Sequence, residues 1–168
     1  MSEQQGAGGP AGPGPEHVRL KAFAGTFRAE VKLWMGPGEP MVMTGTMVNT
    51  MDLGGRYLRQ DYTGDPSPGP FPAFEGRGFW GYNNVAGKYE GFWIDNASNV
   101  MHLERGDLDG DGKTWTMAAE VPDPGGAGTM IKRSVITLEG EDHHRMESYH
   151  VKDGQPSKTM EITYVRSG

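Results

Sequence analysis

The sequence contains no cysteine, so it can form no disulfide, no thiolate metal site and no thiol nucleophile. It also lacks long apolar stretches, whereas a transmembrane helix needs about 20 such residues. Basic clusters are absent too: the largest is the pair Lys132–Arg133, and the net charge is −6. Because nucleic acid and anionic membranes both require a basic face, we expect neither as a partner.

The N-terminus has none of the features of a secretory signal. MSEQQGAGG lacks both a positively charged region and an apolar region, which favours a cytoplasmic location. The stretch 6–15, GAGGPAGPGP, contains no apolar residue larger than alanine and cannot bury enough surface to offset its ordering entropy. We therefore predict a disordered Gly/Pro-rich tail over residues 1–15, followed by a single domain over residues 16–168.

One segment has a helical pattern. In residues 15–25, PEHVRLKAFAG, a proline and an acidic residue begin the turn, and Gly25 stands at the expected end. Val18, Ala22 and Phe23 are predicted to share its apolar face. Two turns of helix of this kind could lie across one end of a barrel.

From Thr26 onward the apolar residues alternate with a period of two, which is typical of half-buried strands. Glycine-rich and proline-rich turns separate about ten such segments. The predicted strands are residues 26–35, 41–53, 56–63, 73–82, 87–95, 99–107, 113–121, 128–138, 143–152 and 157–166. The loop 64–72, GDPSPGPFP, cannot join a sheet.

The turns between these strands are short, so consecutive strands are expected to be antiparallel neighbours. The fold predicted is all-β: an antiparallel up-and-down barrel of about ten strands with one short N-terminal helix, which leaves no exposed sheet edge. A two-sheet sandwich is the alternative. A barrel of about ten strands is wider than one filled by side chains alone, so an internal cavity is expected.

Four stretches, in order, carry a family resemblance. They are AGTFRAEVKLWMGPGEP (24–40), GTMVNTMDLGGRYLRQDYTG (45–64), GYNNVAGKYEGFWIDN (81–96) and KTMEITYVR (158–166). Together they resemble the bacterial "domain of unknown function 1579" proteins, a family of lipocalin-like, calycin-type β-barrels. The resemblance implies a barrel with a hydrophobic interior, and it brings no established reaction and no agreed ligand.

Aromatic and polar residues share faces on three of the predicted strands. The predicted ligand-binding residues are Arg56, Gln60, Trp80, Tyr82, Trp93 and Asp95. If these faces point inward, they would line a cavity with aromatic surface and a few polar anchors, as small-molecule sites usually are. Arg56 could then pair with Asp95 or with a ligand carboxylate. A packed core containing a satisfied ion pair remains an equal alternative.

Two patterns could indicate a bound metal or haem. Residues 107–112, DLDGDG, match the first half of a calcium loop, but the twelfth position is Ala118 rather than a bidentate glutamate, so a hairpin turn is favoured. An inward histidine such as His102 or His150 could ligate haem, although no motif selects either residue. We expect no cofactor, with haem and calcium left open.

The sequence leaves three functions open. The first is a binding protein that holds a small, partly apolar ligand in its cavity; Met41, Met43, Met47 and Met51, on one strand face, would suit such a pocket as well as an ordinary core. The second is an enzyme of low signature that uses a buried carboxylate such as Glu104, with a raised pKa. The third is a structural or self-associating protein that forms a homodimer.

Overall fold

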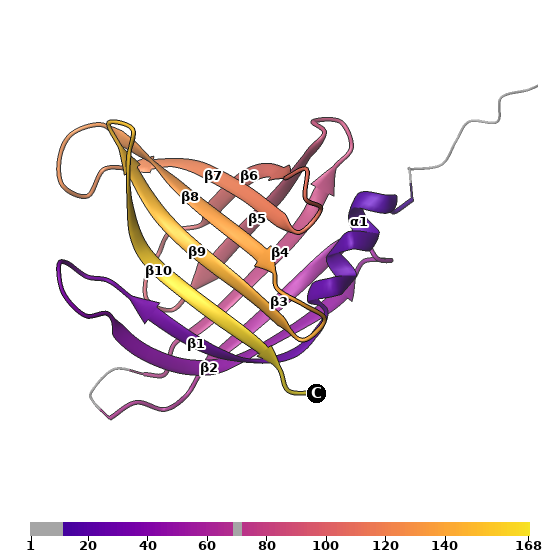
Figure 1. The fold of residues 1–168 in the computed structure, drawn as a ribbon, viewed down its shortest axis with the longest axis horizontal. Coiled ribbons are helices and arrows are strands. Elements are labelled where there is room, and N and C mark those ends of the chain that lie inside the picture. The colour runs from indigo at the N-terminus through magenta and orange to yellow at the C-terminus, as the bar shows by residue number, and fades with distance from the viewer. Residues whose placement is uncertain (1–11, 69–71) are drawn as a thin grey trace, which may run out of the picture.

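The computed structural model describes residues 12–68 and 72–168, and it forms a closed antiparallel barrel of ten strands (Figure 1). The strands are β1 (Gly25–Leu33), β2 (Met41–Asp52), β3 (Tyr57–Gly64), β4 (Glu75–Asn83), β5 (Lys88–Asp95), β6 (His102–Leu108), β7 (Thr114–Pro122), β8 (Thr129–Leu138), β9 (His143–Lys152) and β10 (Gln155–Arg166). Each strand pairs with its neighbours in sequence, and β10 closes the barrel against β1. The predicted up-and-down barrel is confirmed, and the sandwich is excluded.

The predicted helix is present, and the apolar face assigned to it is right for Phe23 but wrong for Val18 and Ala22. It consists of α1 (Pro15–Arg19) followed by the 3₁₀ turn η1 (Leu20–Phe23). The buried residues are His17, Leu20 and Phe23, whereas the side chain of Val18 is 52% exposed. A 3₁₀ turn has about three residues per turn, so positions separated by three align on one face. This shorter repeat explains why residues 17, 20 and 23 face the barrel together.

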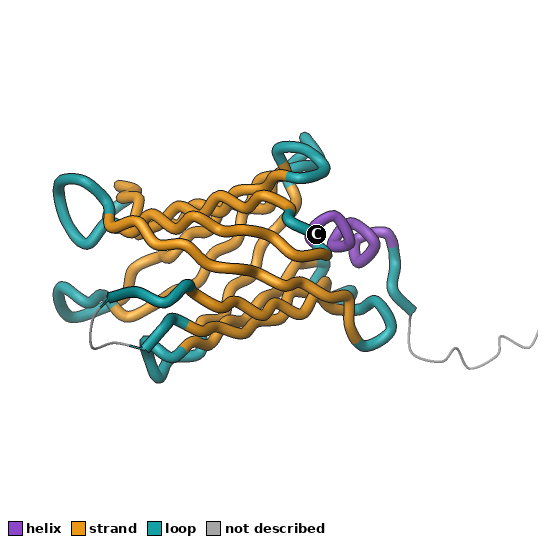
Figure 2. Tube along the Cα trace, turned by 90° about the horizontal axis from the view of Figure 1, so that it is seen from below, coloured by secondary structure: helices purple, strands orange, loops and turns teal. Residues whose placement is uncertain are grey.

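This N-terminal segment closes one end of the barrel, with α1 lying across the strand ends (Figures 1 and 2). The Phe23 ring enters the interior, with its centroid 5.0 Å from Trp80 and 5.1 Å from both Trp115 and His144. Asn49 Nδ2 donates a 2.9 Å hydrogen bond to the carbonyl of Phe23. The aromatic contacts and this bond together hold the segment as a plug.

Gly25 connects the plug to β1, as the sequence predicted for the end of the helix. Its φ of +132° is one that residues with a side chain rarely adopt. A Cβ at this position would collide with Nη1 of Arg166, which donates a 2.7 Å hydrogen bond to the Ala24 carbonyl. The Arg166 guanidinium also lies 4.6 Å from the centre of the Phe27 ring. Arg166 therefore ties the last strand to the plug.

The predicted tail, residues 1–15, lies mainly outside the described residues. Within its described part, the Gly14 carbonyl accepts hydrogen bonds from the amides of His17 and Val18, both at 3.1 Å, and Pro15 begins α1. In the predicted loop 64–72, Gly64 ends β3, and residues 69–71 are outside the described residues. None of the helices in the described part of the chain is long and apolar enough to cross a membrane.

His144 is a titratable group buried where the plug meets the barrel. Its ring stacks on Tyr164 with the two centroids 4.3 Å apart. It also makes a T-shaped contact with Phe27, with a centroid distance of 4.6 Å. Burial, reinforced by the positive charge of Arg166, lowers the pKa of His144 from 6.5 to about 3. The folded protein therefore holds a neutral imidazole at pH values where the unfolded chain would carry a charged one.

This burial predicts a loss of stability in acid. Between pH 6.5 and about 3 the unfolded chain takes up a proton at His144 that the folded protein excludes, so the free energy of unfolding falls by up to about 1.4 kcal/mol per pH unit. His144→Phe keeps a ring and removes this proton uptake. Urea unfolding at pH 7 and pH 4 should show a smaller loss for His144→Phe than for the wild type.

The control is His143→Phe, because His143 is the preceding residue of β9 and is exposed. It should lose as much stability between the two pH values as the wild type. If His144→Phe shows the same pH dependence as the wild type, the acid sensitivity does not come from His144.

Candidate functional site

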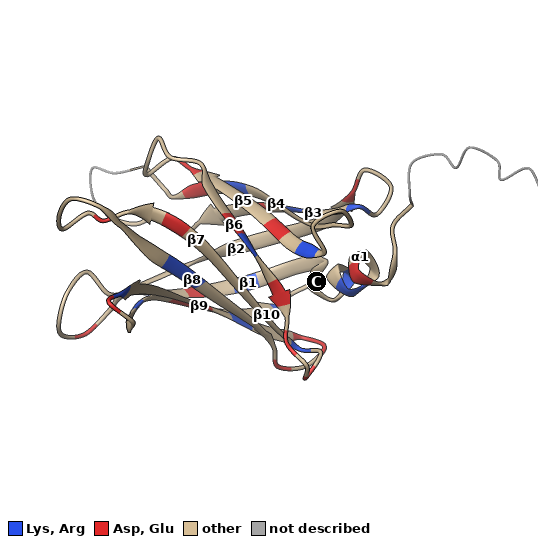
Figure 3. Cartoon of the chain, turned by 90° about the horizontal axis from the view of Figure 1, so that it is seen from above, with Lys and Arg blue, Asp and Glu red and all other residues tan. Residues whose placement is uncertain are grey.

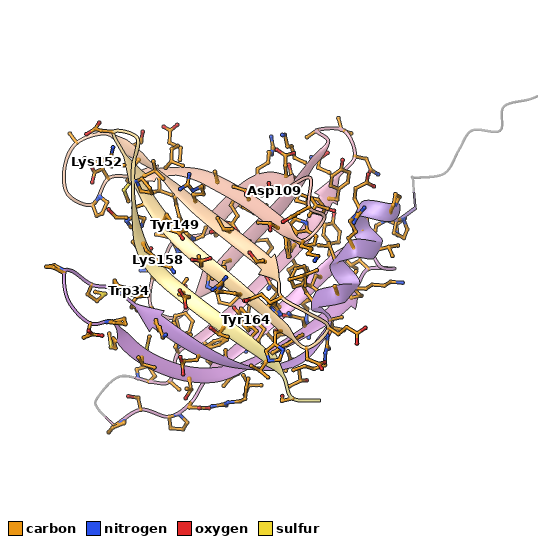
Figure 4. The ribbon with its side chains drawn as sticks, in the orientation of Figure 1. Trp34, Asp109, Tyr149, Lys152, Lys158 and Tyr164 are labelled. Atoms are coloured by element: carbon orange, nitrogen blue, oxygen red, sulfur yellow. The ribbon has the colours of Figure 1, made fainter. Side chains whose placement is uncertain are left out.

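The barrel interior has two parts that differ along the barrel axis. At the α1 end a buried cluster fills the barrel; its members are Leu20, Phe23, Leu58, Trp80, Tyr89, Trp115 and Met117. Tyr164 lies toward this end of β10, whereas Lys152 lies at the opposite end, where β9 turns into β10 (Figure 4). That opposite end has no helix across it in the described part of the chain, and we call it the open half.

Three of the predicted ligand-binding residues belong to the plugged end. Trp80 is 7% exposed, and its ring centroid lies 5.6 Å from that of Trp115. The ring centroids of Tyr82 and His17 are 5.8 Å apart. Arg56 lies in the turn before β3, where Nη1 donates a 3.4 Å hydrogen bond to the Leu53 carbonyl. The structure thus places all three around the plug.

The other three predicted residues, Gln60, Trp93 and Asp95, lie farther along the barrel. Trp93 Nε1 donates a 3.0 Å hydrogen bond to the Asp95 carboxylate, which also accepts the Ala97 amide at 3.0 Å. Asp95 pairs with Gly76 at the open end of β4, whereas Arg56 precedes the opposite end of β3. The two are therefore at opposite ends of the barrel, and the predicted Arg56–Asp95 ion pair does not form.

Two glycines of β4 set the position of the Trp93 ring. A Cβ at Gly76 would collide with the ring, and one at Gly78 would lie 2.8 Å from Trp93 Cε3. The indole therefore lies flat against the β4 backbone. The ring also packs against a second buried cluster, which includes Met47, Tyr62 and Ile162.

The two sides of the open half differ in chemistry. On the side formed by β1, β2, β3 and β10, inward residues such as Val31, Met47 and Ile162 make an apolar wall. On the side of β6, β8 and β9 the inward residues include Met130 but are mostly polar: His102, Glu104, Lys132, Ser134, Ser148 and His150. The interior of the open half is therefore amphipathic.

Glu104 and Ser134 form a contact across this polar side. Ser134 Oγ donates a 2.9 Å hydrogen bond to Glu104 Oε2, although the two residues are on β8 and β6 with β7 between them. Ser134 and Ser148 are direct ladder partners, and both are almost fully buried. Ser134 is also the ladder partner of Met117, a member of the buried cluster.

Lys132 faces two histidines that the fold keeps neutral. It is half-buried and is the direct ladder partner of His150 on β9. Burial lowers the pKa of His102 and of His150, and the charge of Lys132 lowers both further. At His102 the carboxylates of Asp95 and Glu104 act in the opposite direction, and at His150 Asp123 does so.

The wall has a gap beside these polar residues. Strands β6 and β7 pair only over Arg105–Leu108 and Trp115–Ala118, so residues 102–104 and 119–122 have no partner across this seam. A recess of about 200 Å³ lies here; its lining includes His102, Glu104, Ala119, Val121 and Lys132. A second recess, of about 380 Å³, is lined by Glu90, Gly91, Leu103, Glu104, Arg105 and Ala118. Glu104 lines both.

Apolar side chains surround this gap and the open end. Val100, Met101 and Leu103 are 56%, 68% and 66% exposed. Of the four methionines predicted to share one face, Met47 is buried, whereas Met41 and Met43 are exposed at the open end of β2. These residues give the entrance an apolar surround, while charges of both signs are interspersed over the strands (Figure 3).

Sequence reasoning singled out His102 and His150 but selected neither, and it missed Lys132 and Ser134. Alternation along β8 does place Met130, Lys132 and Ser134 on one face, so this signal was present in the sequence. What was missing was the strand register, which brings β6, β8 and β9 together on one side of the interior.

Residues 107–112, whose pattern matches half a calcium loop, contribute to the turn between β6 and β7, as favoured from the sequence. Asp111 accepts hydrogen bonds from the amides of Lys113 and Thr114, at 2.9 and 3.1 Å, and Asp107 pairs with Lys88 at 2.6 Å. Within residues 12–68 and 72–168, no three His, Asp or Glu side chains are grouped as metal ligands. These carboxylates thus have structural partners within the turn and on the neighbouring strand.

The enzyme hypothesis required an inward carboxyl group with a raised pKa. The carboxyls whose pKa the fold displaces are Asp65, Asp111, Asp123 and Glu147, and in all four the pKa is lowered. Hydrogen bonds are the main cause, from Arg28, the Lys113 amide, Lys152 and Lys158 respectively. These four groups therefore favour their charged forms.

Comparison with known proteins identifies the family. The pattern of the family described as "Protein of unknown function (DUF1579)" matches residues 12–166. The chain belongs to this family. A comparison with curated proteins found none that matches.

Among solved structures, the barrel is similar to the S-type phycobiliprotein lyase CPES from Guillardia theta. The TM-score is 0.62 with 12% sequence identity, over 93% of this chain and 99% of the other. At this identity the likeness shows the fold alone. This chain and the lyase thus have the same kind of barrel fold.

The position of Trp93 predicts the effect of two glycine substitutions. Gly76→Ala should displace the indole and lower the free energy of unfolding by about 1–3 kcal/mol, because the added methyl overpacks the ring. The indole N–H resonance of Trp93 should shift, since its hydrogen bond to Asp95 is disturbed. Chemical denaturation and NMR of the indole region measure both effects.

Gly91→Ala is the matched control, since its Cβ would meet only ordinary contacts, at 3.6–3.8 Å. It should leave the Trp93 resonance in place. An unchanged Trp93 resonance in Gly76→Ala would show that the ring does not rest on β4.

Proposed function

We propose that the protein binds a small, partly apolar molecule in the open half of its barrel. The observation that carries this proposal is the gap between β6 and β7, where a recess of about 200 Å³ reaches the inward side chains His102, Glu104 and Lys132. A binding site needs such a passage from solvent to half-buried polar groups, whereas a purely structural barrel does not need one.

The lining has the composition of a small-molecule site. Such sites combine apolar surface with a few placed polar groups. Ala119 and Val121 supply apolar surface in the recess, and the polar groups converge from β6 and β8. Val31 and Ile162, on the far side of the interior, belong to a buried apolar cluster and would close the site opposite the gap.

Within this proposal the predicted residues have two roles. We assign Gln60, Trp93 and Asp95 to the ligand-facing surface of the open half. Arg56, Trp80 and Tyr82 would instead stabilise the plugged end of the barrel, because they surround the plug. Aromatic packing at one end would thereby preserve free volume at the other.

The likeness to a phycobiliprotein lyase adds limited support. It places this barrel form in a protein whose name denotes an enzyme acting on phycobiliproteins. At 12% identity it transfers no residue and no reaction. The proposal of binding within the barrel rests instead on the contacts of this chain.

A neutral apolar dye tests the proposal. N-phenyl-1-naphthylamine should bind with increased fluorescence, because the recess removes it from water. Ala119→Phe places a ring into the recess from the inward face of β7 and should weaken binding at least tenfold. A fluorescence titration of both proteins gives the two dissociation constants.

Thr63→Phe is the control, since Thr63 is an exposed residue of β3 outside both recesses. It adds the same apolar surface and should leave dye binding unchanged. Absence of dye binding to the wild type, or equal binding by Ala119→Phe, would overturn the proposal. Native mass spectrometry of the protein purified from its own host then identifies any molecule that copurifies.

A further inference from the structure

We infer that the ligand is an amphipathic anion, with a carboxylate or similar group held by Lys132 inside the barrel and an apolar body in the gap between β6 and β7. This inference rests on the proposed function and adds the chemical class of the ligand. Its basis is the placement of Lys132 on the inward face of β8, between the buried residues Met130 and Ser134.

Lys132 carries a charge without a counter-ion in the described part of the chain. None of the ion pairs found among residues 12–68 and 72–168 includes it. By contrast, Lys88, Lys152 and Lys158 each pair with a carboxylate at 2.6–2.7 Å. A half-buried ammonium is partly desolvated, so an incoming anion gains more from it than from an exposed lysine.

The nearby carboxylates do not fill this role. Glu104 lines the same recess as Lys132, but its Oε2 accepts the hydroxyl of Ser134. Asp95 is occupied by the Trp93 indole and the Ala97 amide. Glu104 Oε2 and the Asp95 carboxylate thus have other donors, and neither residue forms an ion pair with Lys132.

The two histidines favour the same ligand. His102 and His150 lie near Lys132, and the lowered pKa of each keeps it neutral at pH 7. A neutral imidazole can donate one hydrogen bond, so both rings can add to anion binding without a second charge in the interior. A bound anion would raise the pKa of both histidines and so favour the imidazolium form. The carboxylates of Asp95 and Glu104 already act in this direction at His102, and that of Asp123 does so at His150.

The surroundings of the gap determine the rest of the ligand. Val100, Met101 and Leu103 are exposed beside β6, and Val121 and Pro122 line the recess from β7. A body of methylene or aromatic groups would bury this apolar surface while its acidic end reaches Lys132. Because the net charge of the chain is −6, general attraction would not draw an anion to it, and selectivity would depend on the local ammonium.

Competition between matched ligands tests this inference. Decanoate and decanamide share a chain and differ in charge, and each is titrated against the protein loaded with N-phenyl-1-naphthylamine. Decanoate should displace the dye at a concentration at least tenfold lower than decanamide. Lys132→Met should remove this preference while the dye still binds, and Lys132→Arg should retain most of it.

Two further variants distinguish the source of the preference. Lys32→Met removes a positive charge from the outer face of β1, where Lys32 lies 3.9 Å from Glu30, and should keep the wild-type preference. Glu104→Gln removes the negative charge that shares the recess and should strengthen decanoate binding.

The outcomes separate the inference from the proposed function. If the dye binds and decanoate competes no better than decanamide, the ligand is not an anion, although the barrel still binds small molecules. If Lys132→Met keeps the wild-type preference, the anion is held elsewhere and the assignment of Lys132 is wrong. If the dye does not bind the wild type at all, the proposed function itself fails.

Discussion

The packing of Phe23 among Trp80, Trp115 and His144 is the contact on which the rest of the structure depends. A ten-stranded barrel is too wide for its own side chains to fill easily. The N-terminal segment solves this at one end by inserting an extra ring from outside the sheet. Because the large aromatic residues gather around that ring, small and polar residues can occupy the other end. The asymmetry of the interior is thus a consequence of the plug.

The polar side of the open half depends on this division. Ser134, Ser148 and Gly91 are small inward residues beside the aromatic cluster, where Ser134 pairs with Met117 and Gly91 pairs with Trp80. Glu104 and Lys132 have opposite charges in one recess, yet none of the ion pairs among the described residues joins them. Leaving such groups unpaired destabilises a fold. Their retention beside a gap in the wall is therefore more consistent with a site than with a core.

The sequence predicted the fold well because the relevant signals are local. Alternation in residues 26–35 and turns such as 36–39 need only neighbouring residues to be recognised, and they gave strand limits within a few residues of those observed. The face of the N-terminal helix was predicted wrongly at Val18 and Ala22, because Leu20–Phe23 forms a 3₁₀ turn in which positions three residues apart align.

The site could be predicted only in part because it depends on strand register. Alternation placed Trp80 with Tyr82 and Trp93 with Asp95 on common strand faces, and in the structure these faces point inward. It could not say that Trp80 lies beside the plug while Asp95 lies at the far end. Nor could it show that β6 separates from β7, because that follows from where each strand is paired and not from any residue type.

The bond from Arg166 to the Ala24 carbonyl joins residues 142 positions apart. Strand β1 can complete its pairing with β10 only after the whole chain is present, so closure must come late in folding. Until then β1 has a free edge, and the ring of Phe23 has no complete pocket. During synthesis the hairpins can form in order from the N-terminus, but the interior becomes a container only when the last strand is added.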